Sequence, residues 1–420
     1  MSATTRDDAL GINSLGRIGK LLLWHHVERG HFRRVVVNLG REVGRNLEAV
    51  CDIIERDSTY GAMHRFLRGV NAEPCIRIVD RERRVLDVGG VEVTVLQEAR
   101  NPKDIAWRDH GVRLVVDATG AFDDPTRPLE HPSGSLRGHL AAGAEKVIYS
   151  AAFKIKDPTA DVPDDVTTLV YGINHDSFDP QRHDLVSAAS CTTTALAHML
   201  RPLVDRLSAS QVMTASMSTV HAVTNSQSVL DSTPAAGAKD LRRTRSALNS
   251  IILTSTNAAA TLEKVIPELA SVGFMADSVR VPVPTESLLI LNITFQSAMD
   301  AAGESTIGAE VLNEIYREAA DGAQRGLLVY SDRQNVPADV SGMRAAVVIE
   351  GVETHTRTGF VCVDLAGARG LPDGVREQLA GQVVEVPVTH AKIFGWYDNE
   401  YGSYTNLLGD LSVHVHQALG

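Results

Sequence analysis

The residues best suited to chemistry are a cysteine at a predicted helix start and a histidine later in the chain. Ser190 and Cys191 precede leucines at helical spacing, and Ser190 is a plausible N-cap, which would place Cys191 in the first turn. Unpaired N–H groups and the helix dipole stabilise a thiolate there. His221 leaves a strand-like run and would activate that thiol, because Cys–His pairing favours the thiolate. A reactive cysteine with a histidine partner is one interpretation of this pattern.

A structural role is the alternative for each of these residues. Cysteine is among the most buried residue types, and we expect Cys51, Cys75 and Cys362 to be structural. Most isolated histidines are also structural or exposed, so chain order alone does not establish that Cys191 and His221 meet. The four cysteines form no CxxC pair, so the sequence predicts neither a disulfide framework nor a metal site.

A turn near the N-terminus has the residue types of a phosphate cradle. Residues 11–20 are Gly-Ile-Asn-Ser-Leu-Gly-Arg-Ile-Gly-Lys and lead into an apolar stretch. Gly16 allows close approach of a pyrophosphate and Gly19 allows close packing of the following helix, whereas Ser14 replaces the first glycine of a dinucleotide fingerprint. A tight turn before a surface helix is the alternative explanation.

Short β-branched runs alternate with helical periodicity in the first third of the chain. This alternation predicts βαβ units around a parallel sheet. The apolar spacing from Leu47 to Ile54 predicts a helix. The expected strands are residues 35–38, 113–120, 146–150 and 168–172.

From about residue 212 the pattern changes, because strand-like runs now follow one another. They cover residues 212–223, 286–296, 326–331, 345–350, 360–365 and 390–397. One helix is predicted between them, with Gly322 as its stop signal and an apolar face made of Val311, Leu312, Ile315, Tyr316 and Ala319. Glycine and proline residues from 366 to 374 predict a long surface loop.

The predicted fold class is therefore α/β plus α+β. A Rossmann-like dinucleotide-binding domain is expected over residues 1–189, and a catalytic domain with a mostly antiparallel sheet over 190–402. A C-terminal helix at about 403–420 is expected to pack back on the first domain.

Composition and charge exclude several classes of protein. Hydrophobic residues make up 44% and charged residues 22%, which excludes a disordered or coiled-coil chain. The formal charge of −11 disfavours binding to nucleic acid or to a membrane surface, but not a small phosphorylated ligand in a local basic pocket. No apolar run is long enough to span a bilayer, and the N-terminus lacks the pattern of a secretory signal. Scattered cysteines suit a reducing cytoplasm, which is the expected location.

Four segments, taken in order, resemble phosphorylating glyceraldehyde-3-phosphate dehydrogenase. They are residues 11–19, Ser190-Cys-Thr-Thr193, Thr219-Val-His-Ala-Val-Thr-Asn225 and Trp396-Tyr-Asp-Asn-Glu-Tyr-Gly402. The chain looks longer than the family norm, with extra residues before Cys191 and between the 326–331 strand and Trp396.

The resemblance implies roles for the reactive pair and for the cofactor site. Cys191 would form a thiohemiacetal with an aldehyde and then, after hydride transfer to a nicotinamide, a thioester that phosphate cleaves. His221 would be the general base, and Asn399 would hold the nicotinamide amide; a simple turn asparagine is the alternative. The other expected cofactor residues are Gly16, Arg17, Ile18, Asn38, Arg41, Thr119, Gly120 and Ser150.

The resemblance also implies two anion pockets, one for the substrate phosphate and one for the attacking phosphate. Thr224 and Arg280 would contribute to the first, and the second would use Ser190, Thr192, Arg243 and Thr256. Arginine and hydroxyl groups suit phosphate oxygens. A solvated basic face is the alternative for Arg243. The implied partners are glyceraldehyde 3-phosphate and inorganic phosphate, in a homotetramer.

Two further functions stay open at this point. One is a related dehydrogenase of another phosphorylated aldehyde such as erythrose 4-phosphate, because several residues near the anion sites depart from the family pattern. The other is a non-catalytic, regulatory relative that kept the fold. The joint presence of Cys191, His221, Arg280 and Asn399 argues against the second.

The end of the second strand bears on cofactor choice. A dinucleotide fold usually carries an acid there, which accepts both ribose hydroxyls and repels the 2′-phosphate of NADP. Leu39 stands at that place with Arg41 two residues on, and Ser232 and Thr233 replace the Leu-Pro of NAD-specific relatives. We therefore predict NAD or NADP as cofactor, with NADP accepted at least comparably. The alternative is that Asn38 suffices for NAD.

Overall fold

The computed structural model describes residues 9–97, 99–157, 159–365, 372–379 and 381–420. The chain divides into two compact units. The first holds Met1–Ala197, Ser341–Ala346 and Asp398–Gly420, and the second holds His198–Val340 and Val347–Tyr397. The chain thus leaves the first unit within helix α5 (Cys191–Leu207) and returns to it twice.

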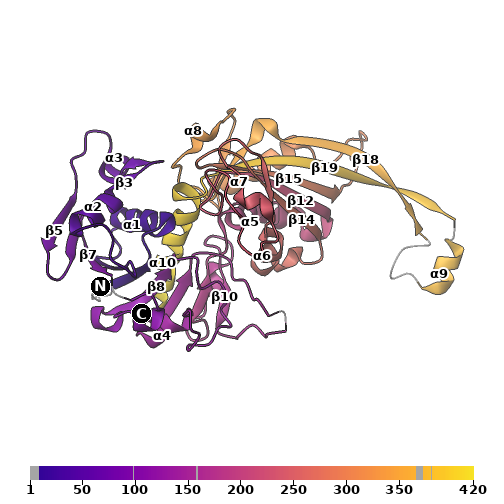
Figure 1. The fold of residues 1–420 in the computed structure, drawn as a ribbon. Coiled ribbons are helices and arrows are strands. Elements are labelled where there is room, and N and C mark those ends of the chain that lie inside the picture. The colour runs from indigo at the N-terminus through magenta and orange to yellow at the C-terminus, as the bar shows by residue number, and fades with distance from the viewer. Residues whose placement is uncertain (1–8, 98, 158, 366–371, 380) are drawn as a thin grey trace. The chain divides into compact units, whose positions relative to one another are not determined.

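A nine-stranded sheet forms the centre of the first unit, in the order β10-β11-β9-β8-β1-β2-β7-β6-β5 (Figure 1). Neighbours from β10 to β7 pair in parallel, whereas β6 and β5 are antiparallel at one edge. The strands are β1 (Ala9–Asn13), β2 (Arg34–Asn38), β5 (Ile76–Asp80), β6 (Val85–Val88), β7 (Val91–Leu96), β8 (Val112–Asp117), β9 (Lys146–Tyr149), β10 (Val166–Thr168) and β11 (Leu185–Ser187). The short strands β3 (Arg56–Asp57) and β4 (Gly61–Ala62) pair separately.

Helices pack on this sheet because the parallel strands require crossover connections. The helix α1 (Arg17–Arg29) joins β1 to β2, and residues 21–24 are fully buried in the core. The indole Nε1 of Trp24 donates to the Ile54 carbonyl oxygen at 2.7 Å, which ties α1 to α2 (Leu47–Glu55). The remaining helices of this part are α3 (Met63–Arg68) and α4 (Arg137–Ala141).

Three of the four strands predicted for the first domain are confirmed as β2, β8 and β9. The strand predicted over 168–172 is wrong, because it overlaps β10 only at Thr168. Residues 171–174 form a turn, where the Asn174 side chain accepts from the Val170 N–H at 2.8 Å and donates to the Thr168 carbonyl oxygen at 2.9 Å. The antiparallel edge β5–β6 was not predicted.

The second unit is built on an eight-stranded sheet whose main path is β13-β14-β12-β15-β19-β17-β16, with β18 paired to β19. Pairing is antiparallel except between β12 and β14 and between β16 and β17, so the predicted sheet type is confirmed. The strands are β12 (Val212–His221), β13 (Ile252–Thr254), β14 (Gly273–Arg280), β15 (Ser287–Gln296), β16 (Leu328–Ser331), β17 (Val347–Glu350), β18 (His355–Asp364) and β19 (Val383–Tyr397).

The helices of the second unit are α6 (Ala258–Val265), α7 (Ala309–Asp321), α8 (Pro337–Val340) and α9 (Asp373–Gln378). The predicted helix is confirmed as α7, but Val311 is 42% exposed and does not belong to the buried stripe of Leu312, Ile315 and Tyr316. Strands β18 and β19 continue beyond the rest of the sheet as a long ribbon (Figure 1). Residues 366–371 of the predicted loop lie outside the described residues, and Asp373 already begins α9.

The C-terminal segment belongs to the first unit. It starts with a π-helical turn, Tyr401–Thr405, and continues as α10 (Asn406–Ala418), so the α-helix begins later than the predicted residue 403. Nη2 of Arg29 in α1 donates to Asp410 Oδ1 and to the Asn406 carbonyl oxygen, both at 2.8 Å. No helix in the described part of the chain is long and apolar enough to cross a membrane.

Candidate active site

Cys191 is the first residue of α5, and the residue before it caps the helix. The Ser190 hydroxyl accepts from the Thr193 N–H at 3.1 Å, and the Ser190 carbonyl oxygen accepts from the Thr194 N–H at 2.8 Å. The predicted N-cap is therefore confirmed. It places the half-buried Cys191 in a first turn without acidic residues, where the helix dipole favours a thiolate.

The backbone that leads into α5 is strained and tightly held. Ala189 is fully buried and has φ = +56°, a left-handed conformation that is uncommon outside glycine. The Tyr404 hydroxyl donates to the Ala189 carbonyl oxygen at 3.3 Å. Burial, and after it the neighbouring Cys191, raise the pKa of Tyr404, so its phenol stays a neutral donor. Such strain persists where the surroundings hold a turn in place, as they do at this helix start.

His221 is the last residue of β12, in the second unit, and is 3% exposed. Its Nδ1 lies 2.7 Å from the Ala222 carbonyl oxygen; in the tautomer that carries the proton on Nδ1, the ring donates to this oxygen and has its lone pair on Nε2. Strand pairing sets Arg280 directly beside it, and the guanidinium contacts Nδ1.

The surroundings of His221 affect its charge state. Burial, followed by the Arg280 guanidinium, lowers the pKa of His221 to about 3. An isolated imidazole in these surroundings is therefore unprotonated near pH 7 and can accept a proton. Cys191 and His221 belong to different units, so their pairing stays a prediction.

The residues predicted for the substrate phosphate lie near the end of β12: Thr224 follows this strand, and Arg280 ends the neighbouring strand β14. Arg280 donates to the Ala222 carbonyl oxygen at 3.1 Å. The Thr224 hydroxyl donates to Gln227 Oε1 and lies near the Ser226 hydroxyl, each at 2.9 Å. The second unit thus holds an arginine and small hydroxyl groups in one region, a combination that suits phosphate oxygens.

The residues predicted for the attacking phosphate are divided between the units. Ser190 and the buried Thr192 lie at the start of α5 in the first unit. In the second unit, Arg243 is exposed in a short 3₁₀ turn, and the Thr256 hydroxyl accepts from the Ala258 N–H at 3.2 Å at the start of α6. A shared pocket for these four residues stays a prediction.

The glycine turn between β1 and α1 fits a pyrophosphate. A Cβ at Gly19 would lie 1.9 Å from the Ser14 carbonyl oxygen, so only glycine fits there. Ser14 has φ = +89°, a conformation that glycine adopts without strain, and its hydroxyl accepts from the Gly16 N–H at 3.1 Å. The helix α1 has no side-chain cap at Gly16 and no acid in its first turn, so its N-terminus is open to an anion.

The residues predicted for the cofactor follow neighbouring parallel strands, whose carboxyl ends share one edge of the sheet. The sheet therefore brings them into one region of the first unit. They are Gly16, Arg17 and Ile18 after β1, Asn38 at the end of β2, Thr119 and Gly120 after β8, and Ser150 after β9.

Asn38 is part of a buried hydrogen-bond network between the strands. It is 1% exposed, and its amide nitrogen donates to Asn13 Oδ1 and to the Ala99 carbonyl oxygen, each at 2.9 Å. Asn13 in turn donates to Asp117 Oδ2 at 2.8 Å. Both amide N–H groups of Asn38 are used in this way, so its side chain joins strands and has no N–H left for a ribose.

The side chain of Arg17 is committed to two carboxylates. Its guanidinium forms ion pairs with Asp57 and Glu400. Burial alone would lower the pKa of Arg17, but the two carboxylates together raise it. The side chain of Arg17 is thus used in ion pairs, one of which holds the turn that contains Glu400.

The same turn carries Asn399, the residue expected to hold the nicotinamide. The preceding residue, Asp398, accepts from the Tyr60 hydroxyl at 2.7 Å and from the Gly342 N–H at 2.9 Å. Asn399 is 6% exposed. Contacts of Asp398 with residues that are far away in sequence thus fix the turn that carries Asn399.

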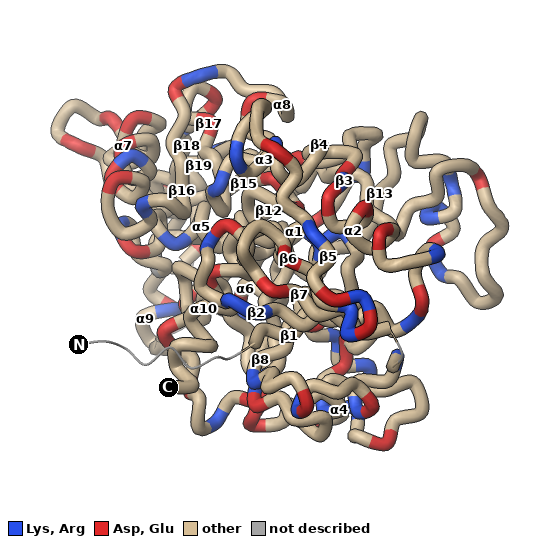
Figure 2. The backbone as a smooth tube through the Cα atoms, turned by 90° about the vertical axis from the view of Figure 1, so that its left-hand side faces the viewer, with Lys and Arg blue, Asp and Glu red and all other residues tan. Residues whose placement is uncertain are grey.

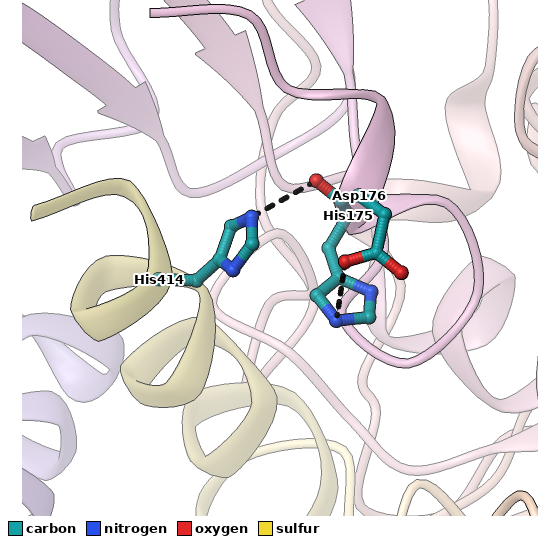
Figure 3. A group of neighbouring side chains, drawn as sticks. All are labelled: His175, Asp176 and His414. Atoms are coloured by element: carbon teal, nitrogen blue, oxygen red, sulfur yellow. Dashed lines mark hydrogen bonds and ion pairs between the residues drawn. The ribbon is translucent and has the colours of Figure 1, made fainter. Parts of the chain in front are cut away.

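His175, Asp176 and His414 form a group that resembles a metal site (Figure 3). The Gly172 N–H donates to His175 Nδ1 at 3.0 Å, so the proton of this ring lies on Nε2. His414 Nε2 donates to the His175 carbonyl oxygen at 3.1 Å. A ligating histidine needs a lone pair toward the metal. In His175 that lone pair is already used, so the chemistry of this group does not suit a metal.

Comparison with protein families agrees with this arrangement. Residues 9–125 match the NAD binding domain of glyceraldehyde 3-phosphate dehydrogenase, and residues 190–363 match its C-terminal domain. The fold and these matches define a NAD-dependent oxidoreductase.

Curated relatives cover the chain almost completely. The chain is 34% identical to glyceraldehyde-3-phosphate dehydrogenase 1 of Streptomyces avermitilis, over 98% of this chain and 99% of the relative. Identity is 32% with the enzyme of Streptomyces coelicolor, over 98% and 99%, and 30% with enzyme 2 of Bacillus subtilis, over 97% and 96%. The chain belongs to the glyceraldehyde-3-phosphate dehydrogenase family.

Sequence patterns missed the residues that surround the predicted site. The Tyr404 hydroxyl contacts the Ala189 carbonyl oxygen just before α5, and the Tyr60 hydroxyl contacts Asp398. Both contacts join segments that are distant in sequence, so no local pattern reveals them. The sequence contains three arginines close together, at 81, 83 and 84, but their spacing did not predict that they lie near the end of β2.

Proposed function

We propose that this chain catalyses the phosphorylating oxidation of glyceraldehyde 3-phosphate to 1,3-bisphosphoglycerate, with NAD or NADP as hydride acceptor. The observation that carries the proposal is the Ser190-capped start of α5, which sets Cys191 in the field of a helix N-terminus in a chain of this family. Residues 1–189 would bind the cofactor, and residues 190–402 would carry the chemistry.

In the proposed reaction the Cys191 thiolate attacks the aldehyde carbon and forms a thiohemiacetal. His221 takes the hydroxyl proton of that adduct, a step that requires an unprotonated ring. A bound nicotinamide supplies the hydride acceptor. The carbon that loses its hydride becomes a thioester on Cys191, and a phosphate oxygen attacks it to release the acyl phosphate and the thiolate.

Two groups of residues would hold the phosphates. Arg280 and Thr224 would bind the substrate phosphate, and Ser190, Thr192, Arg243 and Thr256 would bind the attacking phosphate. Support for the first group is the arginine and hydroxyl cluster at the end of β12. Asn399 would orient the nicotinamide, because the turn that carries it is held by the hydrogen bond from the Gly342 N–H to Asp398.

The proposed cofactor range includes NADP. The position that follows Asn38 is Leu39, so no carboxylate repels a 2′-phosphate there. Asn38 itself is held in the strand network, which weakens the case that it binds the ribose of NAD alone. The enzyme would work in the cytoplasm as a homotetramer, by analogy with the family and in line with four cysteines that form no disulfide.

Steady-state kinetics test this function directly. We expect phosphate-dependent reduction of NAD and of NADP with glyceraldehyde 3-phosphate, and slower turnover with erythrose 4-phosphate. A preference for erythrose 4-phosphate would show that this aldehyde, and not glyceraldehyde 3-phosphate, is the substrate. Activity that does not depend on phosphate would contradict the phosphorylating step. An inert Cys191 thiol together with no turnover would point to a regulatory relative.

A further inference from the structure

A series of hydrogen bonds runs through the core of the first unit and ends at the carboxyl edge of its sheet. It joins five side chains that are each at most 3% exposed: Trp107, His139, Asp117, Asn13 and Asn38. The last three are the final residues of β8, β1 and β2, which are neighbours in the sheet. The proposed reaction uses neither the histidine nor the tryptophan.

The indole of Trp107 determines which ring nitrogen of His139 carries the proton. An indole Nε1 can only donate, and this one lies 2.9 Å from His139 Nδ1. Nδ1 therefore accepts, so the imidazole is neutral and its proton lies on Nε2. This nitrogen donates to Asp117 Oδ2 at 3.0 Å. The structure thus makes His139 a neutral donor to a carboxylate.

Asp117 is the residue at which the series branches. Charged residues of both signs are interspersed along the chain (Figure 2), but Asp117 is fully buried, and among the described residues no lysine or arginine forms an ion pair with it. Besides His139, Oδ2 accepts from Asn13 Nδ2 at 2.8 Å. Oδ1 accepts from the Thr119 N–H at 3.1 Å and from the Thr119 hydroxyl at 2.6 Å. Four donors therefore satisfy a charge that is costly to bury.

One branch sets the direction of the hydrogen bonds along the edge of the sheet. Because the Asp117 carboxylate only accepts, the amide nitrogen of Asn13 faces it, and the amide oxygen of Asn13 faces the next strand. That oxygen accepts from Asn38 Nδ2 at 2.9 Å, and Asn38 Oδ1 accepts from the Gly40 N–H at 3.3 Å. The backbone just after β2 is thus connected to the core carboxylate.

The other branch closes the turn after β8. The Thr119 hydroxyl donates to Asp117 and accepts from the Ala121 N–H at 3.1 Å. Thr119 and Gly120 are exposed at the edge where the cofactor is expected. The bonds to Asp117 therefore hold the backbone of this turn in one position while its outer side stays exposed.

We propose that His139 is a positioning residue for the nicotinamide cofactor and acts on it only through Asp117. The inference rests on the proposed function, because it names a residue that prepares the cofactor site of that reaction. An edge that is already ordered binds its ligand more tightly than one that binding must order. Without the His139 donor, Asp117 Oδ2 would lose a partner in the core, and both branches would be held less firmly. A histidine with a structural role alone would contribute to stability and not to cofactor affinity.

Calorimetric titration with NAD tests this role without turnover. His139→Leu removes the donor, and we expect the dissociation constant for NAD to rise about tenfold. His139→Gln offers an N–H to Asp117 and a carbonyl oxygen to Trp107, so it should recover most of the affinity. In both variants, the alkylation rate of Cys191 without cofactor and the KM for glyceraldehyde 3-phosphate at saturating NAD should match the parent values.

His26→Leu is the matched control, because His26 is a fully buried histidine of the same unit that does not belong to this series. It should bind NAD like the parent, and thermal unfolding should show that the variants are folded. Should His139→Leu fail to fold, Trp107→Phe is the second test. It keeps the imidazole but removes the donor that fixes its tautomer, and the dissociation constant for NAD should rise about threefold.

An unchanged dissociation constant in a folded His139→Leu variant, or in Trp107→Phe if the first variant does not fold, would overturn the proposal. An equal loss of affinity in His26→Leu would overturn it as well. The same holds if His139→Gln binds NAD as weakly as His139→Leu, because the donor would then not be what matters. Cys191 alkylation that falls as much as NAD affinity would indicate general damage to the fold, and would also contradict a positioning role.

The failure of this inference is distinguishable from failure of the proposed function. A parent enzyme that binds NAD and oxidises glyceraldehyde 3-phosphate, but whose His139 variants bind NAD normally, would keep its function and lose this positioning residue. A parent that binds NAD, with the expected loss in His139→Leu, but does not oxidise glyceraldehyde 3-phosphate would mean the reverse.

Discussion

The start of α5 and the end of β12 carry the two residues expected to do the chemistry, and their properties have different origins. The field at Cys191 comes from the backbone of its own helix and from the cap at Ser190, one residue away. The state of His221 comes from burial and from Arg280, which strand pairing brings from 59 positions along the chain. Local chain geometry sets the first environment, and tertiary packing sets the second.

This difference explains why one motif predicted the environment of its residue and the other did not. Ser-Cys-Thr-Thr before a helical repeat predicts its own cap, because the donor and the acceptor lie within four residues. The histidine motif contains no information on Arg280, so the sequence did not show what lowers the pKa of His221. The following variants test whether the two environments differ in this way.

The largest effect is expected for Cys191→Ser, because a serine hydroxyl stays protonated even at a helix N-terminus. Turnover should be abolished while the fold and NAD binding persist. Steady-state kinetics, thermal unfolding and NAD titration would measure this. Cys362→Ser, at an exposed position in β18, is the matched control and should keep parent activity. Substantial activity in the Cys191 variant would show that the helix start does not carry the nucleophile.

His221→Asn should reduce kcat/KM by about 10²-fold or more, since it removes the general base. Alkylation of Cys191 by iodoacetamide near neutral pH should also slow if the two side chains meet in the working enzyme. His355→Asn, at an exposed position of the same unit, should change neither quantity. An alkylation rate that matches the parent would mean that the thiol depends on its helix alone.

His26→Phe tests whether a lowered histidine pKa by itself marks a functional residue. Burial, and then Arg29, lower the pKa of His26 in the same way as at His221, and among the described residues neither ring nitrogen of His26 has a hydrogen-bond partner. Below the ordinary histidine pKa of about 6.5, the unfolded chain takes up a proton at this position and the native state does not. Native stability is therefore lost as the pH falls from about 6.5.

The variant should be about 1 kcal/mol more stable near pH 7.5, because two unpaired buried nitrogens are removed. Near pH 5.5 its advantage should grow by about 1.4 kcal/mol, one proton over one pH unit. Urea unfolding at both pH values measures this, with activity near pH 7.5 unchanged. A parallel pH dependence in parent and variant would show that His26 titrates normally in the native state.

The smallest effect is expected for Ser14→Gly in the cofactor turn, where a local strain can be removed. Glycine adopts φ = +89° freely, which should relieve about 1 kcal/mol, and the Gly16 N–H would lose its intramolecular acceptor. The dissociation constant for NAD should fall about threefold, since this N–H becomes available to the pyrophosphate. Ser14→Ala keeps the strain without the hydroxyl and should be less stable than the parent. Weaker NAD binding in both variants would mean that the hydroxyl itself contacts the cofactor.

Much of the fold could be predicted because apolar periodicity reports which face of an element is buried. The valine-rich run that became β2 and the amphipathic α7 are examples. The strand expected over 168–172 failed because the Asn174 side chain takes up the backbone groups that a strand would have paired. The strands β5 and β6 are only five and four residues long, so a periodic pattern has few positions in which to show.

The sequence by itself determined the family, the two sheet types, the glycine turn and the capped helix start of Cys191, because each depends on side-chain types within a few residues of one another. Only the tertiary structure decided what lowers the pKa of His221, that the side chains of Arg17 and Asn38 are used within the fold, and that Trp107 and Asp117 both contact His139. These outcomes depend on desolvation and on charged and polar groups brought together by packing across long stretches of chain. A linear pattern records which charges a chain has, and packing decides which of them become neighbours.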